Sequence, residues 1–425
     1  MLPLFTVIIP QKNRSEYLEY TLKSCMIQEY PNFEIIVSDD CSTDDSVELV
    51  KSLMERDSRI KLFAHNAHLG MRNNFEFALN QVKPGFVLAL GGDDGLVFGC
   101  IERMYEILSS TGKDLLTWSP AGFTYPKEKG GKNIVHFKRT KFKGVRIINS
   151  HKFLSKLSQS FFYQVDDCPM LYMKGVVSTD IINKVKSRSL DGNFYSCSTP
   201  DGYSGIVLAG EVENYVYTNE PLTIGGDSIK SQGRNYTSTE KEARKEAEQF
   251  FNDNLNRKMH RMLASQEYSP LVTLMTADFL LTAQDLPGWP GKFSPISFEA
   301  LIVATFKLME TTEHKHEVLI RELKILKAIA EQHDLLELYN NLLSTTKRRM
   351  LYKEEIYGTV ITNSIRFDGS EIGIKNIYDA SVSMNVMYKI YNKISFNEFI
   401  HIVKNTFRIF NRKWSYKLEK LPNVN

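Results

Sequence analysis

The stretch Phe33-Glu-Ile-Ile-Val-Ser-Asp-Asp-Cys-Ser-Thr-Asp44 joins an apolar, β-branched run to a cluster of polar and acidic residues. Such a run is typical of a buried strand, and the residues after it are typical of a turn that leads into a helix. Similar runs occur at Thr6–Ile9, Ile60–Phe63, Phe86–Leu90 and Leu115–Trp118. Helical patterns lie between them, at about 15–28, 44–56, 71–82 and 100–110.

This alternation predicts an α/β fold with a doubly wound, mainly parallel sheet. In such sheets ligands bind beyond the carboxyl ends of the strands, so the residues after each strand matter most. Four polar clusters stand there, at residues 10–14, 38–44, 66–74 and 91–95. We therefore expect them to meet at one edge of the sheet.

The pattern changes after Gly233, where helices are predicted over about 237–344 with one break at Leu286–Gly291. We expect three parts: an α/β domain over 1–235, a helical domain over 236–345 and a C-terminal extension over 346–425. Sequence from Ser119 to Cys197 gives few signals for individual elements.

The composition excludes several classes of protein. Hydrophobic residues make up 42% and charged residues 24%, as in ordinary globular proteins, and the net charge of +3 does not favour a nucleic-acid partner. The five cysteines form no C-x-x-C pair, so the sequence indicates neither a zinc site nor a disulfide framework. No apolar stretch reaches the roughly 18–20 residues that span a bilayer. A cytoplasmic location fits these features best.

Four motifs in this order resemble the family 2 glycosyltransferases with a GT-A fold. They are Thr6–Pro10, Ile35–Asp44, the segment from Asn66 to Asn73, and Leu90-Gly-Gly-Asp-Asp94. The resemblance covers about residues 4–110 well and extends more loosely to about 230. It implies a Rossmann-like catalytic domain that binds a UDP-sugar, here followed by a mostly helical C-terminal region.

The resemblance implies a nucleotide site around the turns after the first three strands. In this family a carboxylate after the second strand accepts the N3–H of uracil, and Asp39 matches that position, with Asp40 beside it; an ionised carboxylate suits this because it only accepts hydrogen bonds. The alternative is that the segment only caps a helix, a role that Asp44 fits well. The other nucleotide-binding candidates are Pro10, Asn13, Arg72 and Asp94. Arg72 is equally compatible with an exposed, solubilising charge.

Asp93 falls on the position at which the family binds a divalent metal, Mg²⁺ or Mn²⁺. Such ions are commonly held by one or two carboxylates together with substrate phosphates. The family's motif is usually Asp-x-Asp, and Gly91 replaces its first acid here. The alternative is an acidic surface turn, which the apolar run before it disfavours.

An inverting transferase needs a general base that takes the proton of the acceptor hydroxyl. The family often supplies an acid that opens a helix late in the α/β domain, and Asp201 matches it, with Pro200 in place of the usual Glu. Two alternatives stay open. Asp201 could be an ordinary helix N-terminal aspartate, and the pair Asp166–Asp167 could supply the base.

The C-terminal segment from Met384 to Asn425 is basic and aromatic, and residues 396–414 have the spacing of an amphipathic helix. It could lie on an anionic membrane surface or pack on the protein itself. The sequence thus predicts a metal-dependent inverting glycosyltransferase of surface-polysaccharide synthesis, at the inner face of the plasma membrane. Its partners would be a UDP-sugar and a glycan or lipid-linked acceptor, and a homo-oligomer stays open. The alternative is a non-catalytic nucleotide-sugar-binding protein.

Overall fold

The computed structural model describes residues 2–126, 131–138, 144–231, 241–254, 256–311, 316–351, 360–361, 364–391 and 416–422. The predicted amphipathic helix at 396–414 lies outside these residues, as does the predicted domain boundary near 235. The division into three domains stays a prediction.

The main sheet has eight strands in the order β3-β2-β1-β4-β10-β6-β11-β9. Its first four strands are parallel, as the alternating pattern predicted. The bounds are β1 Phe5–Gln11, β2 Phe33–Asp39, β3 Ile60–Ala64, β4 Phe86–Ala89, β6 Leu115–Trp118, β9 Val145–Asn149, β10 Gly175–Ser178 and β11 Asn214–Thr218.

Helices cover both faces of this sheet, which explains why β1 and β2 are buried along their whole length. Alternate residues of a strand point to opposite faces, so Val7 and Ile9 join one hydrophobic core and Ile8 joins the other. The helices of this part are α1 Ser15–Met26, α2 Ser46–Met54, α3 Met71–Asn80, α4 Cys100–Thr111, α5 Ser150–Ser160, α6 Leu171–Lys174, α7 Thr179–Arg188 and α8 Asp201–Glu211.

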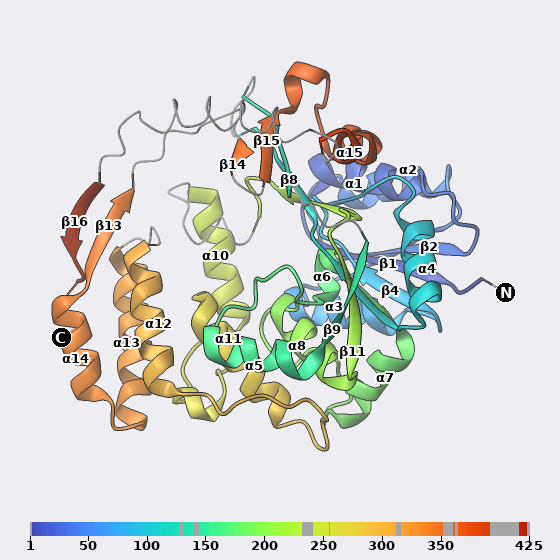
Figure 1. The fold of residues 1–425 in the computed structure, drawn as a ribbon. Helices are drawn as coiled ribbons and strands as arrows, with labels where there is room; N and C mark the ends of the chain where they lie inside the picture. The colour runs from blue at the N-terminus through green and yellow to red at the C-terminus, as the bar shows by residue number, and fades with distance from the viewer. Residues whose placement is uncertain are drawn as a thin grey trace.

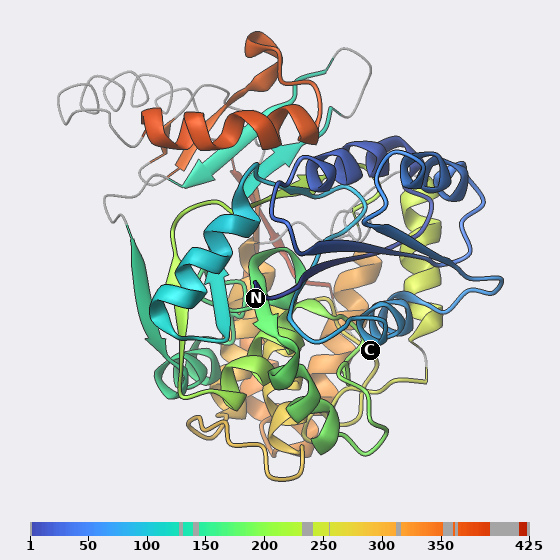
Figure 2. The same cartoon turned by 90° about the vertical axis from the view of Figure 1, so that its right-hand side faces the viewer.

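A second sheet of six strands stands beside the first, in the order β14-β15-β8-β7-β12-β5. The bounds are β5 Gly95–Leu96, β7 Ala121–Thr124, β8 Ile134–Lys138, β12 Thr223–Asp227, β14 Val360–Ile361 and β15 Ser364–Asp368. The 3₁₀ turn η2 Gly369–Ile372 and helix α15 Ile377–Tyr391 follow β15, and α15 packs on α1 (Figures 1 and 2). Part of the predicted C-terminal extension is thus built into the N-terminal half.

The helical region confirms the change of pattern after residue 233. It contains α10 Lys241–Asp253, the 3₁₀ turn η1 Arg261–Leu263, α11 Val272–Gln284, α12 Phe298–Thr311, α13 His316–Gln332 and α14 Leu336–Thr345, followed by the ribbon of β13 Lys347–Leu351 and β16 Tyr416–Lys420. Helix α11 packs against α8, and the indole of Trp289 donates a 3.1 Å hydrogen bond to the carbonyl of Val207 on α8. The helical region is therefore attached directly to the helix that begins at Asp201.

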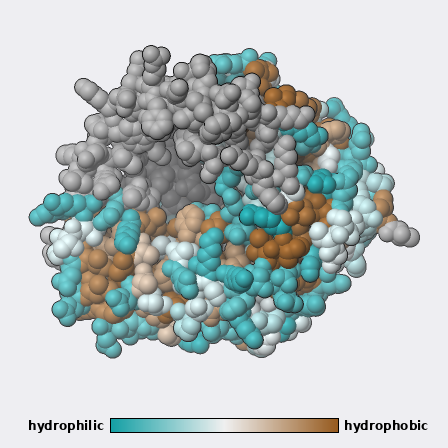
Figure 3. Space-filling model, viewed as in Figure 1, coloured by the Kyte–Doolittle hydropathy of each residue, from teal (hydrophilic) through white to brown (hydrophobic). Residues whose placement is uncertain are grey.

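No helix in the described part of the chain is both long enough and apolar enough to cross a membrane. On the face viewed in Figure 3, the coloured hydrophobic side chains form separate patches between hydrophilic ones.

Candidate active site

A cleft of about 670 Å³ lies beyond the carboxyl ends of β1, β2 and β4. It is also lined by the first residues of α8, by α10 and by the segment that leads into α11. Of the residues singled out from sequence, five line it: Pro10, Asn13, Asp40, Asp93 and Asp201. The expectation that the strand-end clusters meet at one edge of the sheet is confirmed for Pro10, Asn13, Asp40 and Asp93, and Asp201 joins them from the start of α8.

Asn13 ties the turn after β1 to the turn after β2. Its backbone N–H donates to the Ser42 hydroxyl at 2.8 Å, and its side-chain oxygen accepts from the Thr43 N–H at 2.8 Å. Its φ of 52° lies in the left-handed region, which asparagine tolerates better than most residues. Asp44 accepts hydrogen bonds from Ser15 and Ser46 at the starts of α1 and α2.

Asp39 and Asp40 stabilise different parts of the turn after β2. Asp39 accepts hydrogen bonds from the Gln11 side chain and, at 2.9 Å, from the Ser42 N–H, and it does not line the cleft. Asp40 does line it, and accepts from the N–H groups of Leu69 and Gly70. On this side the cleft is thus lined by Asp40, and Asp39 stabilises the turn behind it.

His68 connects Asp40 to helix α10. Its Nδ1 lies 2.8 Å from a carboxylate oxygen of Asp40, and its Nε2 lies 2.9 Å from a carboxylate oxygen of Asp253. The Lys12 ammonium is 3.1 Å from the same Nδ1. Since His68 lies between two carboxylates, it holds the C-terminal end of α10 against the turn after β2.

Asp93 is the acid of the turn after β4 that lines the cleft. Its Oδ2 accepts hydrogen bonds from the hydroxyls of Ser228, at 2.6 Å, and Ser231, at 3.0 Å. Among the described residues no hydrogen bond to its Oδ1 is found. The carboxylate is therefore fixed on one side and leaves one oxygen for a ligand.

Asp94 has a structural position instead. Its two oxygens accept from the N–H groups of Gly91, at 2.7 Å, and Gly226, at 2.9 Å. Burial, and then the neighbouring charge of Asp93, raise the pKa of Asp94 to about 7. A Cβ on Gly226 would lie 1.8 Å from the Asp93 carbonyl oxygen, so only glycine allows this close approach.

Residues 228–231 close over the end of β1. The Lys230 ammonium donates to the carbonyl of Asn13 at 2.8 Å, and the Arg14 guanidinium donates to the carbonyl of Lys230. Together with Ser228 and Ser231, these contacts tie the segment after β12 to both the β1 turn and Asp93.

Asp201 is the first residue of α8 and lines the cleft. Its Oδ2 accepts from the Tyr163 hydroxyl at 3.3 Å, while its Oδ1 is buried without a hydrogen-bond partner among the described residues. Burial raises the pKa of this carboxyl. Burial, and then the charges of Asp94 and Asp93, raise the pKa of the Tyr172 hydroxyl, and Tyr172 lines the same cleft as Asp93 and Asp201.

Two predicted groups lie outside the cleft lining. The Arg72 guanidinium donates to the carbonyl of Tyr195 and lies 3.6 Å from a carboxylate oxygen of Asp191. Asp166 pairs with Lys138, and the carbonyl of Asp167 accepts from the Tyr215 hydroxyl. The structure therefore does not bring Arg72 or the Asp166–Asp167 pair to the residues described above.

No group of three or more His, Cys, Asp or Glu side chains in the described part of the chain has the arrangement of a metal site. The cleft fits a different arrangement. A divalent ion held mainly by substrate phosphates needs only one or two protein carboxylates. Asp93, with one oxygen fixed and the other without a hydrogen-bond partner among the described residues, can supply that ligand.

Several residues of the cleft gave no signal in the sequence: Tyr163, Tyr172, Asp253 and Tyr268. They come from loops and helices that packing brings together, and no local pattern marks them. A motif search can find Asp93, but its hydroxyl partner Ser228 is 135 positions away.

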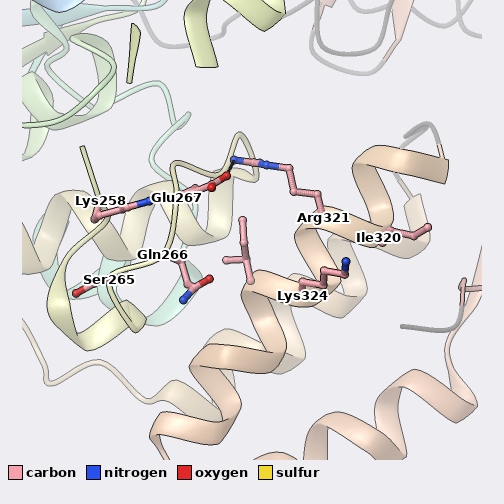
Figure 4. Close-up of a pocket in the computed structure, with 8 residues that line it drawn as sticks. Lys258, Ser265, Gln266, Glu267, Ile320, Arg321 and Lys324 are labelled. Atoms are coloured by element: carbon pink, nitrogen blue, oxygen red, sulfur yellow. Dashed lines mark hydrogen bonds and ion pairs between the residues drawn. The ribbon is translucent and has the colours of Figure 1, made fainter. Parts of the chain in front are cut away.

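A second hollow, of about 490 Å³, lies between the segment 265–267 and helix α13. Figure 4 shows Arg321 reaching from α13 toward Glu267, 3.4 Å away, with Lys258 and Lys324 at the margins. It holds none of the residues predicted to act chemically.

Comparison with known proteins identifies the N-terminal part. Residues 6–168 match the model of the family described as glycosyl transferase family 2. The chain contains a family 2 glycosyltransferase domain. The resemblance seen in the sequence motifs is thereby confirmed, as is the mixed α/β architecture with a helical C-terminal region.

Curated relatives of this glycosyltransferase domain cover about a quarter of the chain. The GalNAc(5)-diNAcBac-PP-undecaprenol beta-1,3-glucosyltransferase of Campylobacter jejuni is 38% identical over 106 residues, which are 25% of this chain and 34% of that protein. The putative teichuronic acid biosynthesis glycosyltransferase TuaG of Bacillus subtilis is 30% identical over 106 residues, 25% of this chain and 42% of that protein. The chain thus matches less than half the length of either relative.

Solved structures align over more of the chain. TarS 1-349 of S. aureus in complex with UDP-GlcNAc aligns with 80% of this chain and 90% of that chain, at a TM-score of 0.42 and 15% identity. The mannosyltransferase PcManGT of Pyrobaculum calidifontis, in complex with GDP-Man and Mn²⁺, aligns with 81% and 84% of the two chains, at a TM-score of 0.40 and 13% identity.

Proposed function

We propose that this protein transfers a sugar from a UDP-sugar to a hydroxyl of a glycan or lipid-linked acceptor, with inversion at the anomeric carbon. The observation that carries the proposal is that Asp93 and Asp201 line one cleft, together with Tyr172. A transferase needs these two centres, one for the leaving diphosphate and one for the attacking hydroxyl. A protein that only binds nucleotide sugars has no need for the second.

The nucleotide occupies the end of the cleft formed by the turns after β1 and β2. We assign the uracil to the pair Asp39–Asp40, with Asp40 at the cleft surface and Asp39 bracing the turn through Gln11 and Ser42. Pro10 and Asn13 line the same end. Asp94 orders the acidic turn, and Arg72 supports the carbonyl of Tyr195, so both act as positioning residues.

A divalent ion, Mn²⁺ or Mg²⁺, bound to Asp93 would neutralise charge on the diphosphate. The hydroxyls of Ser228 and Ser231 hold the Asp93 carboxylate in place for that role. The segment 228–231 also covers the β1 turn, so it limits access of water to the donor end.

Asp201 accepts the proton of the acceptor hydroxyl. As that proton moves to Asp201, the hydroxyl oxygen forms a bond to the anomeric carbon, and the bond from this carbon to the diphosphate oxygen breaks with its electron pair on the diphosphate. Burial raises the pKa of the Asp201 carboxyl, and a raised pKa makes its ionised form a stronger base.

The relatives support a place in surface-polysaccharide synthesis. The names of the C. jejuni and B. subtilis relatives specify an undecaprenol-linked acceptor and teichuronic acid biosynthesis. By analogy we place the protein in the cytoplasm, at the inner face of the membrane that carries a lipid-linked acceptor.

The test is UDP release by the purified protein against a panel of UDP-sugars, with Mn²⁺ and with a chelator. We expect one donor to be hydrolysed slowly, with loss of this activity in Asp93→Ala. Transfer to an added acceptor should be lost in Asp201→Ala while UDP binding persists. Binding of UDP without turnover of any donor or acceptor would favour the non-catalytic alternative, and absence of UDP binding would contradict the assignment of the Asp39–Asp40 turn.

A further inference from the structure

We propose that the acceptor unit next to Asp201 is an uncharged sugar ring, held against a wall formed by Phe162, Phe250 and Tyr268. This inference rests on the proposed function, because it takes Asp201 as the group that receives the acceptor hydroxyl. Phe250 and Tyr268 lie outside the family 2 match at residues 6–168. The chain would therefore select its acceptor with residues that the family domain does not supply.

The wall consists of aromatic rings on three segments. Phe250 on α10 and Tyr268 before α11 meet edge to face, with ring centroids 5.3 Å apart. Phe162, after α5, is 41% exposed, and all three line the cleft. Tyr163, which follows Phe162 in the chain, donates its hydroxyl to Asp201 at 3.3 Å, and Asp201 lines the same cleft. Rigid aromatic faces offer contact area to the C–H faces of a sugar at small entropic cost.

Two buried polar atoms of the cleft make no hydrogen bond of good geometry with other described residues. They are Oδ1 of Asp201 and Oγ1 of Thr199, and both residues line the cleft. A buried polar atom left unpaired costs free energy that a hydroxyl would recover. The amides of Gln164 and Gln249 also line the cleft. A hydrocarbon chain would offer no hydrogen bond to the two buried atoms, whereas a sugar has hydroxyls at its edge and apolar faces.

The charges in the cleft disfavour an anionic acceptor unit. Among the described lining residues the cationic or cationisable side chains are Lys12, Arg14 and His68, which belong to the turns after β1 and β3. Around Asp201 the described lining is apolar or bears hydroxyl and amide groups, without a cation. A phosphate or carboxylate placed there would face the Asp201 carboxylate without a compensating cation.

Helix α13 supports the aromatic wall through contacts with Tyr268 and Ser269. Arg321 donates to the carbonyl of Tyr268 at 2.6 Å and lies 2.6 Å from a carboxylate oxygen of Glu322, which accepts in turn from the Ser269 hydroxyl. Figure 4 shows Arg321 extended from α13 toward Glu267. These contacts fix the segment 267–269 before any acceptor binds, so the wall is preorganised.

The test compares octyl glycosides that differ in charge. With the donor found in the UDP-release assay, we expect octyl glucoside or an octyl N-acetylhexosaminide to stimulate UDP release and to yield the glycosylated product. Octyl glucuronide and an octyl glucoside 6-phosphate should stimulate at least tenfold less. Octanol, which has the chain without the sugar, should neither stimulate nor compete.

Variants test the wall itself. Phe162→Ala should raise the KM for the acceptor by a factor about ten times larger than the factor by which it changes the rate of donor hydrolysis. The reason is that an exposed aromatic contact to the acceptor is lost. Phe250→Leu should act in the same direction. Phe98→Ala removes a ring of similar exposure, 39%, that does not line the cleft, and should change neither value.

Four results would overturn the inference: equal or better use of the anionic glycosides, competition by octanol as strong as by the neutral glycosides, no stimulation by any neutral glycoside, or an unchanged acceptor KM in Phe162→Ala. In each of them donor hydrolysis that depends on Asp93 would still support the proposed function. If the wild-type protein neither binds UDP nor hydrolyses a donor, the proposed function fails, and this inference fails with it.

Discussion

The Ser228 hydroxyl donates a 2.6 Å hydrogen bond to Oδ2 of Asp93, which joins the segment after β12 to the acidic turn after β4. Ser231 contacts the same oxygen, and Lys230 reaches the carbonyl of Asn13. The acidic turn is therefore completed by residues that lie outside the family match at 6–168.

We predict that Ser228→Ala weakens the response to metal. Loss of a hydroxyl that orients a ligand typically costs about 10- to 100-fold in metal affinity or activity. The Mn²⁺ concentration for half-maximal UDP release should rise by about that factor. Ser52→Ala, at an exposed serine of α2, is the control and should not change it. An unchanged Mn²⁺ requirement in Ser228→Ala would mean that Asp93 is not the metal ligand.

Gly226→Ala should abolish donor hydrolysis. The new Cβ would lie 1.8 Å from the backbone carbonyl oxygen of Asp93, so β12 or the acidic turn must move and the N–H bond to Asp94 is lost. In Gly225→Ala the Cβ would lie 2.5 Å from Sδ of Met173, whose side chain is flexible, so the effect should be smaller. UDP release and circular dichroism of both variants distinguish local from global damage. Equal activities would contradict the close approach.

The pH dependence of transfer should report the Asp201 carboxyl. The base must be ionised, and burial raises its pKa above the ordinary aspartate value of about 3.9. The acidic limb of kcat/KM should therefore lie above that value, and it should vanish from the residual activity of Asp201→Asn. Transfer by this variant should fall about 10²- to 10⁴-fold. Asp166→Asn, at the alternative acid pair, should keep the wild-type profile. The reverse pattern would identify that pair as the base.

We predict that the folded protein becomes less stable as the pH rises, because the carboxyl of Asp278 is buried. Burial raises its pKa to about 7, whereas in the unfolded chain it titrates near 4. Between these values the folded protein binds more protons, so its stability falls as the pH increases from about 4 to 7. Asp278→Asn should therefore melt higher than wild type at pH 8, with a smaller difference at pH 5, measured by calorimetry. Exposed Asp114→Asn is the control, and a pH-independent difference would contradict the prediction.

We predict that Asp253→Ala releases the C-terminal end of α10 from His68. This substitution removes the carboxylate 2.9 Å from Nε2 of His68, which holds the end of the helix to Asp40. We expect faster hydrogen exchange in residues 245–254 with little change in melting temperature. Asn252→Ala, at the exposed neighbouring position, should exchange like the wild type. Equal exchange rates in the two variants would show that His68 does not hold α10.

Much of the first half was predictable because its signals are local. The β-branched runs around Ile8, Ile36 and Val87 place β1, β2 and β4 within a residue or two, and strand alternation then places Asp40 and Asp93 at one edge. The second sheet was not predictable, because β8 pairs with β15 across more than half the chain. The hydroxyls on Asp93 and the aromatic wall beside Asp201 depend on such packing as well.

The pairing of β8 with β15 has a consequence for how the chain folds during synthesis. Ile134–Lys138 leaves the ribosome long before Ser364–Asp368, so one edge of β8 stays unpaired while the whole helical region is made. Unpaired edges invite pairing with other chains. The nascent protein should therefore need a chaperone over this interval, and chains shortened before Ser364 should aggregate even when every residue of the cleft is present.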